Sequence, residues 1–449
     1  MRKSDYILKK DIVKKYNKQR VQSNFDLPIC LAPYKSLRFL PDGKITVCCH
    51  NNSYILGVYP EVSANQAWKA NEIKYLRKKL KKANFSIGCQ SCFYAFEKLM
   101  FESVDPLLYE NYEISSEHPV MLDFKIATEC NLECIMCSEY SSSAIRTSLN
   151  IEKPKLIYNE AFVDSISFFL KHIKEARFSG GEPFLNDIYF LIWKKLIKEN
   201  PECKIFIQTN GTILNSKIKD LLERGNFYIN VSVDALEPTL YSKIRKNADI
   251  NQTLKNLEYF SDYSRKNQRK FGVTACAMRD NVGEWSNLMN LANKLNADIW
   301  FSEVFFPFKN ALWLAKSKDL AELFKIAELN FENNNSNVQQ NCYNHIILKN
   351  FIIKLKDLWE QAELRESEAD NYCTTVELVE KLKIKFSKLI KNQPDKWKII
   401  EEAILSFQDK YILDLSLFIG KYFTINLVFE EFTKMNKDKL IENFAILLQ

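Results

Sequence analysis

The sequence contains few histidines and few glycines. Its four histidines, His50, His118, His172 and His345, are too widely scattered to indicate a histidine-based metal site or a catalytic triad. Only ten glycines occur among 449 residues, so we expect each one at a position that the backbone geometry requires. The sequence also shows no phosphate-cradling loop, dinucleotide-binding fingerprint or internal repeat.

Long apolar runs are missing as well. No stretch of about 18 uncharged apolar residues occurs, so the sequence predicts neither a transmembrane helix nor a membrane partner. The first residues mix Lys and Arg with apolar residues and lack the continuous apolar stretch of a secretion signal. We therefore expect a cytoplasmic protein. With 46% hydrophobic and 27% charged residues, the chain has the composition of a folded protein of two or three domains.

The net charge of 63 − 56 = +7 is mild for this length. Basic residues gather near the N-terminus, in residues 1–20, and again in the helix-like stretch 74–82. A solvated helix face explains both stretches most simply, and docking of an acidic partner is the alternative. A dedicated nucleic-acid-binding protein is usually more basic, so nucleic acid is not the expected partner.

Twelve cysteines contrast with these scarcities. In a reducing compartment, clustered cysteines are more often metal ligands or catalytic groups than disulfides. Seven of them fall into two groups, and the pattern around them divides the chain. We expect a basic N-terminal segment, an auxiliary domain, a linker, a core barrel and a helical region, at residues 1–25, 26–95, 96–117, 118–308 and 309–449.

The auxiliary domain begins with a hairpin pattern, in which the strand-like stretches 37–40 and 44–48 flank a Pro-Asp-Gly turn. A helix-like segment follows at 63–82. The core alternates apolar runs with amphipathic stretches, which predicts an α/β fold with a curved parallel sheet and a site at its carboxyl edge. The expected core strands are 120–127, 175–179, 204–209, 227–234, 271–278 and 298–305. The last region has long helical periodicities and a polar connection at 330–341.

The first cysteine group follows the first core strand. Cys130, Cys134 and Cys137 have the spacing C-x3-C-x2-C on one loop. Three thiolates suit three corners of a [4Fe–4S] cluster and leave one iron open to another ligand. Zinc is the alternative, but a structural zinc site needs a fourth ligand, and no other Cys or His lies close by in the sequence. The local spacing favours the cluster.

Polar groups also end the next three core strands. These are the motifs Gly-Gly-Glu-Pro at 180–183, Asn-Gly at 210–211 and Ser-Val-Asp at 232–234. Adjacent glycines in so glycine-poor a chain indicate close approach of a ligand to the backbone. Each motif alone is typical of an ordinary turn. Together they place polar groups at the same sheet edge as the cysteine loop.

The cysteine loop combined with Gly-Gly-Glu-Pro resembles the radical S-adenosylmethionine (AdoMet) superfamily, over residues 118–308. The resemblance implies a partial (β/α)6 barrel in which Cys130, Cys134 and Cys137 hold a [4Fe–4S] cluster whose open iron is chelated by AdoMet. An electron donor such as flavodoxin or ferredoxin would reduce the cluster. Cleavage of AdoMet would then give a 5′-deoxyadenosyl radical that takes a hydrogen atom from the substrate.

The same resemblance implies an AdoMet-binding set on the strand ends. Its glycines and glutamate receive the methionine amino group, its serine and aspartate lie near the ribose or methionine portion, and its arginine pairs with the carboxylate. A methionine takes the place beside adenine where the superfamily often has an aromatic residue. The set comprises Met136, Gly180, Gly181, Glu182, Pro183, Asn210, Ser232, Asp234, Arg245 and, less directly, Asn281.

The second cysteine group lies in the auxiliary domain and comprises Cys30, Cys48, Cys89 and Cys92. On spacing alone, four thiolates fit structural zinc and a second [4Fe–4S] cluster equally well. The segment 28–95 resembles a twitch domain, the half-size relative of the SPASM domain, which implies the cluster. Twitch domains usually follow the barrel, so this chain resembles a subgroup that carries one at the N-terminus. A cluster with four thiolates has no open iron and is expected to accept or relay electrons.

Four further residues are candidates for contact with the substrate. Cys276, on the fifth core strand, is a candidate hydrogen-atom donor, and packing in the core is the alternative. Asp123 and Lys125 alternate with apolar residues on the first core strand, and Glu303 lies on the last. If these charges face inward, they either hold substrate or form a paired structural network.

The predicted activity is oxidation of a hydroxyl- or amino-bearing small molecule, with the auxiliary cluster taking the second electron. The first alternative is radical modification of a precursor peptide, as a cross-link or an epimerisation, with the basic helices as a docking surface. An alternative of another class is a non-catalytic zinc or iron–sulfur interaction module. The polar loops gathered at the strand ends argue against that last alternative.

Overall fold

The computed structural model describes residues 6–20, 27–101, 105–115, 117–154, 156–334, 342–367, 372–407, 410–417 and 425–448. The parts of the predicted basic segment at 1–5 and 21–25, and of the predicted polar connection at 335–341, lie outside these residues. Within the described ranges, every helix is too short or too polar to cross a membrane.

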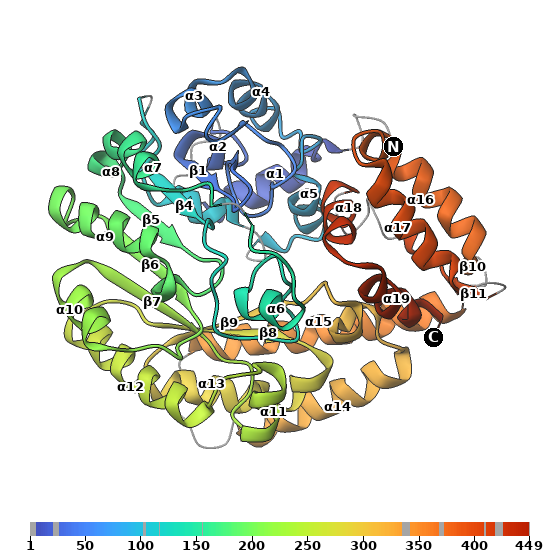
Figure 1. Ribbon diagram of the computed structural model, residues 1–449. Coiled ribbons are helices and arrows are strands. Elements are labelled where there is room, and N and C mark those ends of the chain that lie inside the picture. Colours follow the sequence, from blue (N-terminus) through green and yellow to red (C-terminus); the bar gives the residue numbers. More distant parts are fainter. Residues whose placement is uncertain are drawn as a thin grey trace.

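A sheet of nine strands organises the fold, in the order β3-β2-β1-β4-β5-β6-β7-β8-β9 (Figure 1). Its strands from β4 to β9 pair in parallel and confirm the predicted core. They are β4 Met121–Phe124, β5 Glu175–Phe178, β6 Lys204–Thr209, β7 Phe227–Ser232, β8 Gly272–Ala277 and β9 Asp298–Glu303. β4 ends earlier than predicted because the Tyr189 hydroxyl accepts hydrogen bonds from the amides of Ile126 and Ala127, which draws the chain away from the sheet.

Helices cover the outer face of this sheet (Figure 1). Several begin at an Asn or Asp whose side chain accepts a backbone N–H, as Asn186 does at α9 and Asn215 at α10. The amphipathic stretch 160–173 forms two helices, which are divided at Ile166. The helices of this layer are α7 Glu160–Ser165, α8 Ser167–His172, α9 Asp187–Glu199, α10 Ser216–Arg224, α11 Pro238–Ile244, α12 Ile250–Lys266 and α13 Trp285–Lys294. The short helix α6 Ser143–Ser148 lies inside this ring of helices, against the loop that follows β4 (Figure 1).

The N-terminal hairpin extends the same sheet, which the sequence did not predict. β1 (Ser36–Phe39) pairs antiparallel with β2 (Lys44–Thr46) through the expected turn, where Gly43 has φ +83°. β1 also pairs in parallel with β4, and β3 (Gly57–Val58) lies beyond β2. The predicted helix at 63–82 is divided at Ala70, which is extended. The helices here are α1 Lys10–Asn17, α2 Ala32–Lys35, α3 Ala64–Lys69, α4 Asn71–Leu80 and α5 Gln90–Glu97.

The region after the barrel divides between two hydrophobic cores. α14 (Ser317–Asn334) and α15 (Cys342–Ser367) contribute buried residues to the main core. The remaining elements enclose a second core together with Phe308 and Leu314, and we call described residues 372–447 the C-terminal unit. It contains β10 Tyr372–Thr374, α16 Thr375–Ile390, α17 Pro394–Leu405, β11 Tyr411–Leu413, α18 Ile425–Lys434 and α19 Lys437–Ala445. Short 3-10 helices occur at Asp105–Glu110, Pro183–Leu185, Arg279–Glu284, Phe308–Asn310, Leu312–Leu314, Leu415–Leu417 and Ile446–Leu448.

Candidate functional site

The first cysteine group lies on the loop that follows β4, at the carboxyl edge of the sheet. Cys134 is buried, Cys130 is half-buried and Cys137 is exposed. The Cys134 thiol donates a hydrogen bond to the Cys137 sulfur, which raises the pKa of Cys134 and lowers the pKa of Cys137. The Asn210 amide lies 3.9 Å from the Cys130 sulfur. The structure thus gathers the thiols with a residue from the end of β6.

Backbone contacts brace this loop from two sides. The amides of Glu133 and Ile135 donate to carbonyl oxygens at the carboxyl end of α11, those of Lys246 and Ile244, at 3.0 Å each. Arg146 of α6 joins the two ends of the loop, because its guanidinium donates to the Thr128 oxygen at 3.1 Å and to the Glu139 oxygen at 2.6 Å. The loop from 128 to 139 is therefore held as a closed turn.

The adjacent glycines let the loop after β5 lie against the cysteine loop. Gly180 and Gly181 have φ of +86° and +53°, which side chains disfavour. A Cβ on Gly181 would lie 2.2 Å from the Glu129 carbonyl oxygen, and one on Gly180 would lie 2.9 Å from the Ala127 oxygen. The sequence interpretation attributed these glycines to a ligand. In the structure the neighbouring backbone already requires them.

Glu182 ties the loops after β5 and β6 together. Its fully buried carboxylate accepts hydrogen bonds from the Thr209 hydroxyl and the Asn210 amide at 2.7 Å, and from the Phe184 amide at 3.1 Å. Burial raises the pKa of Glu182, and these donors oppose that rise. Pro183 begins the 3-10 helix that follows. Receipt of an amino group by Glu182 remains a prediction.

Asp234 and Arg245 form a buried ion pair, 2.8 Å from Nε to the carboxylate. Burial opposes the charge of Arg245, but Asp234 raises the pKa of Arg245 above its usual value. Asp234 also accepts from the Cys276 amide at 2.6 Å, and Asn281 donates to the Asp234 carbonyl at 2.9 Å. The structure therefore brings four predicted residues together. Because Arg245 already pairs with a protein carboxylate, its pairing with AdoMet remains a prediction.

Ser232 and Cys276 lie on the strand faces opposite the helix layer. Ser232 accepts a hydrogen bond from the Gln208 side chain at 2.7 Å. Along β8, Ala275 and Ala277 are buried, while Cys276 alternates to the other face. Burial raises the pKa of Cys276 to about 12, and nearby Asp234 adds to the rise. The thiol is therefore neutral near the ion pair, and its role as hydrogen-atom donor remains a prediction. Met136 is partly buried against the main core.

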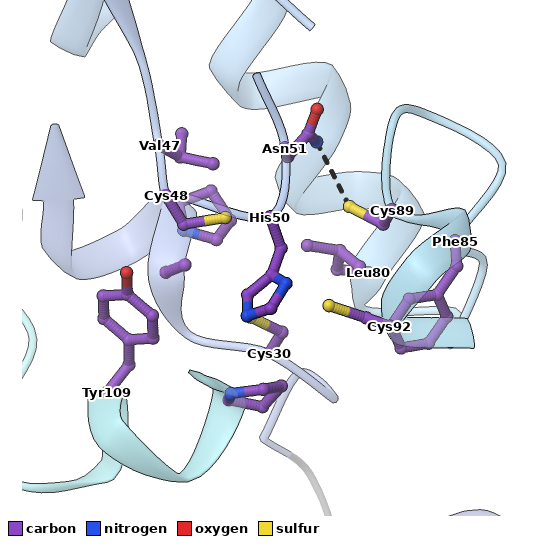
Figure 2. A pocket seen from close by; sticks show the side chains of 13 residues that line it. Cys30, Val47, Cys48, His50, Asn51, Leu80, Phe85, Cys89, Cys92 and Tyr109 are labelled. Carbon is purple, nitrogen blue, oxygen red and sulfur yellow. Dashed lines mark hydrogen bonds between the residues drawn. The ribbon is translucent and has the colours of Figure 1, made fainter. Parts of the chain in front are cut away.

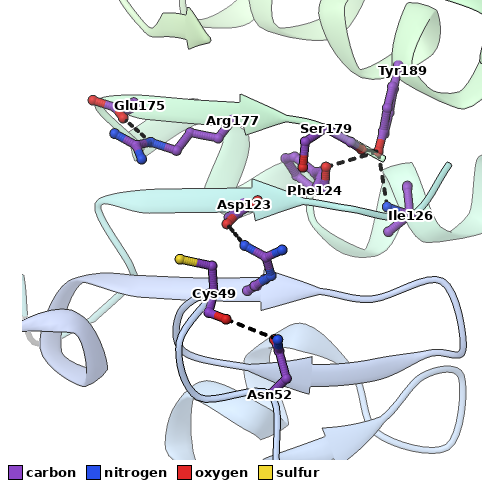
Figure 3. Close-up of polar contacts among 10 residues, drawn as sticks. Cys49, Asn52, Asp123, Phe124, Ile126, Glu175, Arg177, Ser179 and Tyr189 are labelled. Atoms are coloured by element: carbon purple, nitrogen blue, oxygen red, sulfur yellow. Dashed lines mark hydrogen bonds and ion pairs between the residues drawn. The ribbon is translucent and has the colours of Figure 1, made fainter. Parts of the chain in front are cut away.

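The structure shows where the three charged residues that were expected to face inward, Asp123, Lys125 and Glu303, lie. Asp123 pairs with Arg38 of β1, beside Cys49 (Figure 3), and the Lys125 side chain lies against Gly180. Glu303 does not face inward, because it lies opposite the buried Ala277 and pairs at 2.9 Å with Lys354 of α15. The structure therefore corrects the expectation of an inward Glu303. For Asp123 it shows the paired network that was the alternative to substrate contact.

The second cysteine group lines one pocket (Figure 2). Cys30 precedes α2, Cys48 follows β2, Cys89 precedes α5 and Cys92 lies in its first turn. The buried Asn51 amide donates to the Cys89 sulfur at 3.2 Å, and burial raises the pKa of Cys89 to about 12. The predicted four-thiolate set is thus assembled from three separate segments.

The donor sets fit iron–sulfur clusters. Three thiols gather on one braced loop, and four line a single pocket together with apolar side chains. Thiolates are the ligands that such clusters prefer. In the described part of the chain, no group of three or more His, Cys, Asp or Glu side chains is already arranged around one metal ion. The fit therefore rests on donor chemistry and on the gathering of the cysteines.

Sequence reasoning missed Arg38, Asn51 and Arg146. A charged residue within the apolar run of β1 was a usable signal for Arg38. Arg146 gave no local signal, because its partners lie 7 and 18 residues away. Asn51 contacts Cys89 across 38 residues. Such contacts exist only once the chain has folded.

Two family models match the chain. The Radical SAM superfamily model matches residues 124–292, and the SPASM model, described as an iron–sulfur cluster-binding domain, matches residues 30–93. The first match contains the three loop cysteines and the second contains all four pocket cysteines. These matches favour an iron–sulfur cluster over zinc at the second group.

Curated relatives match the chain over less than half its length. A probable GTP 3′,8-cyclase of Methanococcus aeolicus is 28% identical over 205 residues, 45% of this chain and 63% of that protein. A probable GTP 3′,8-cyclase of Methanocaldococcus jannaschii is 30% identical over 193 residues, 42% of this chain and 60% of that protein. The chain thus spans about three-fifths of these relatives.

Solved structures are more distant. A structure described as native anSMEcpe with bound AdoMet is 18% identical to this chain, with a TM-score of 0.35. The match covers 47% of this chain and 60% of the anSMEcpe chain. The structure of Streptococcus suis SuiB bound to precursor peptide SuiA is 14% identical, with a TM-score of 0.36, and the match covers 59% of this chain and 56% of the SuiB chain. These likenesses carry no functional conclusion. On the two family matches, residues 124–292 form a domain of the radical SAM superfamily, and residues 30–93, ahead of it in the chain, form a SPASM-like iron–sulfur domain.

Proposed function

We propose that this protein is an enzyme that removes a hydrogen atom from a substrate held at the carboxyl edge of its sheet. When bound at Cys130, Cys134 and Cys137, a reduced [4Fe–4S] cluster with AdoMet supplies the electron and the hydrogen-abstracting group. One observation carries the proposal. The cysteine loop, the Gly-Gly-Glu-Pro loop and the buried Asp234–Arg245 pair lie at the same edge of the sheet, after β4, β5 and β7.

Hydrogen bonds and an ion pair hold the loops of this site in place. Glu182 fixes the loop after β6, which brings Asn210 beside Cys130. The Asp234–Arg245 pair leaves no unbalanced charge in a buried place, where a lone charge is costly. Gln208 and Ser232 offer hydrogen-bonding groups on the inner strand face. These groups bind and orient a polar substrate while the surrounding apolar layer excludes water.

The second cysteine group is the proposed electron acceptor for a net oxidation. Its four thiolates line one pocket, so all corners of a cluster there have protein ligands. β2, which precedes Cys48, continues through β1 into β4, which precedes the first cysteine loop. Because β2 runs antiparallel to β1 and β4, Cys48 lies at the amino edge of the sheet, across these short strands from the first cysteine loop. The proposed substrate is a small molecule with a hydroxyl or amino group.

Radical modification of a peptide is the second candidate. α4 presents the exposed side chains of Lys74 and Lys78, and Lys81 follows it, which together favour an acidic peptide. The name of the curated relatives adds GTP as a third substrate to test. Each substrate class is distinguished by placing deuterium on it and following its transfer into 5′-deoxyadenosine.

Anaerobic purification and metal analysis test the proposal. We expect brown protein with about eight irons per chain, and release of 5′-deoxyadenosine after dithionite and AdoMet are added. A Cys130→Ala variant should lose this release, while a Cys203→Ala control, away from both groups, should keep it. Colourless protein that holds zinc would instead support a non-catalytic interaction module.

A second variant tests the electron acceptor. Combined Cys89→Ala and Cys92→Ala should leave release of 5′-deoxyadenosine in place and abolish formation of the oxidised product. Full turnover in this variant would contradict the assigned role of the auxiliary site.

A further inference from the structure

The C-terminal unit reaches the first cysteine loop through one ion pair. Lys439 of α19 contacts the carboxylate of Glu139 at 2.5 Å, across 300 residues of sequence. The side chains of Lys439 and Glu139 are 29% and 11% exposed. Because Glu139 is mostly buried, water cannot fully replace the lysine, and loss of the pair costs more than at an exposed site.

The contacted residue belongs to the braced loop. Glu139 lies two residues after Cys137, and its carbonyl accepts the Arg146 hydrogen bond that closes the loop. Lys439 therefore holds the side chain, and Arg146 the backbone, of the same residue. Any displacement of Glu139 moves the end of the segment that carries the three cysteines.

A second set of contacts joins α19 to the segment that follows β9. One turn after Lys439, Asn443 accepts a hydrogen bond from the Phe308 amide at 2.6 Å. Asn310, two residues beyond Phe308, donates to the Ile135 carbonyl within the cysteine loop at 3.3 Å. α19 and the segment 308–310 thus approach the loop at two points, Glu139 and Ile135.

The C-terminal unit provides a rigid base for these contacts. Leu440 and Phe444 of α19 are buried in its separate hydrophobic core, and α19 lies on the side of the unit that faces the barrel (Figure 1). A helix anchored in this way keeps the Lys439 ammonium at a fixed position relative to the loop. The unit does not need to share the core of the barrel to act on it.

We propose that the C-terminal unit positions the AdoMet-cluster loop and that Lys439 is the residue through which it acts. The proposal rests on the proposed function for the identity of the loop. Lys439 is a positioning residue, because it touches Glu139 and not a cysteine. With the lysine in place, the loop 128–139 stays closed. Without it, the buried Glu139 carboxylate turns toward water and the loop opens.

Hydrogen–deuterium exchange on the full, cluster-loaded chain tests this. In Lys439→Met, amides of residues 128–139 should exchange about tenfold faster, a change that corresponds to about 1.4 kcal/mol. Lys439→Arg keeps the charge and should restore slow exchange. Lys437→Met is the matched control, since Lys437 lies on the same helix but pairs with Glu402 inside the C-terminal unit.

A spectroscopic measurement separates positioning from simple stabilisation. The electron paramagnetic resonance signal of the reduced first cluster should respond to added AdoMet in the wild type, in Lys439→Arg and in Lys437→Met, and should respond at least threefold more weakly in Lys439→Met. Unchanged loop exchange in Lys439→Met, or equal effects in Lys437→Met, would overturn the proposal. Exchange does not depend on turnover, so faster loop exchange without any 5′-deoxyadenosine would refute the proposed function and leave the positioning role intact.

Discussion

Replacement of Gly181 by alanine should release the first cluster from an otherwise folded protein. The new Cβ would lie 2.2 Å from the Glu129 carbonyl oxygen, and the backbone there has φ +53°. The left-handed conformation costs roughly 1–2 kcal/mol for a residue with a side chain. The close contact adds about 1–3 kcal/mol.

The same change also strains a hydrogen bond. Glu129 accepts from the Glu182 amide at 2.7 Å, and loss of that bond costs about 1 kcal/mol. The total is roughly 3–6 kcal/mol, a large part of the 5–15 kcal/mol that holds a typical domain folded. Because the clash falls on the cysteine loop, the loop should move before the barrel unfolds.

Iron analysis and urea unfolding measure this effect. We expect the iron content of Gly181→Ala to fall from about eight to about four per chain, together with the predicted loss of stability. Gly283→Ala is the control, since a Cβ there meets only Ile326 at 3.8 Å. If Gly181→Ala keeps full iron content and wild-type stability, the argument that backbone contact requires this glycine is wrong.

Two further predictions concern the buried groups around this loop. Asp234→Asn should lower the free energy of unfolding by about 3–5 kcal/mol, because Arg245 is left buried and unpaired. Asp220→Asn is the control: it breaks the exposed pair with Arg224 and should lower the free energy of unfolding by less than about 1 kcal/mol. Urea unfolding compares the two variants, and equal losses would contradict the assigned burial. Cys276 should react with iodoacetamide at about pH 9 several hundredfold more slowly in the native protein than in urea, because its pKa is raised from about 8.5 in an unfolded chain to about 12. The neutral Cys276 thiol contributes stability to the folded protein below about pH 8.5, and this contribution is lost as the pH rises toward about 12. Mass spectrometry measures alkylation of Cys276 across this pH range, and rapid alkylation of the native protein near pH 9 would contradict the raised pKa.

The local pattern was enough to locate the site. Cys130, Cys134 and Cys137 lie within a stretch of eight residues, and the core strands have strong apolar runs. The cysteine loop and the core strands could therefore be recognised from the sequence. The parallel order of the core strands followed from their alternation with helices. The hairpin at the N-terminus followed from its turn residues, since Gly43 supplies a positive φ at the turn.

The structural roles of several residues could not be predicted from the sequence. Gly180 and Gly181 were attributed to a ligand, yet the backbone of the cysteine loop already requires them. Glu303 was expected to face inward, but a shift of one residue along a strand reverses its side, and α15 supplies Lys354 as its partner. Strand boundaries to within a residue depend on contacts such as that of Tyr189 with Ile126 and Ala127.

The sequence by itself determined the cysteine chemistry, the alternation of strands and helices, and the edge of the sheet where the polar loops gather, because each depends on residues close together in the chain. Only the tertiary structure decided that β1 continues the barrel sheet, that Arg245 pairs with Asp234, and that α19 reaches the cysteine loop through Lys439. These contacts join residues from 11 to 300 positions apart. Long-range pairings of this kind depend on how whole elements pack, and packing leaves no mark in a local stretch of sequence.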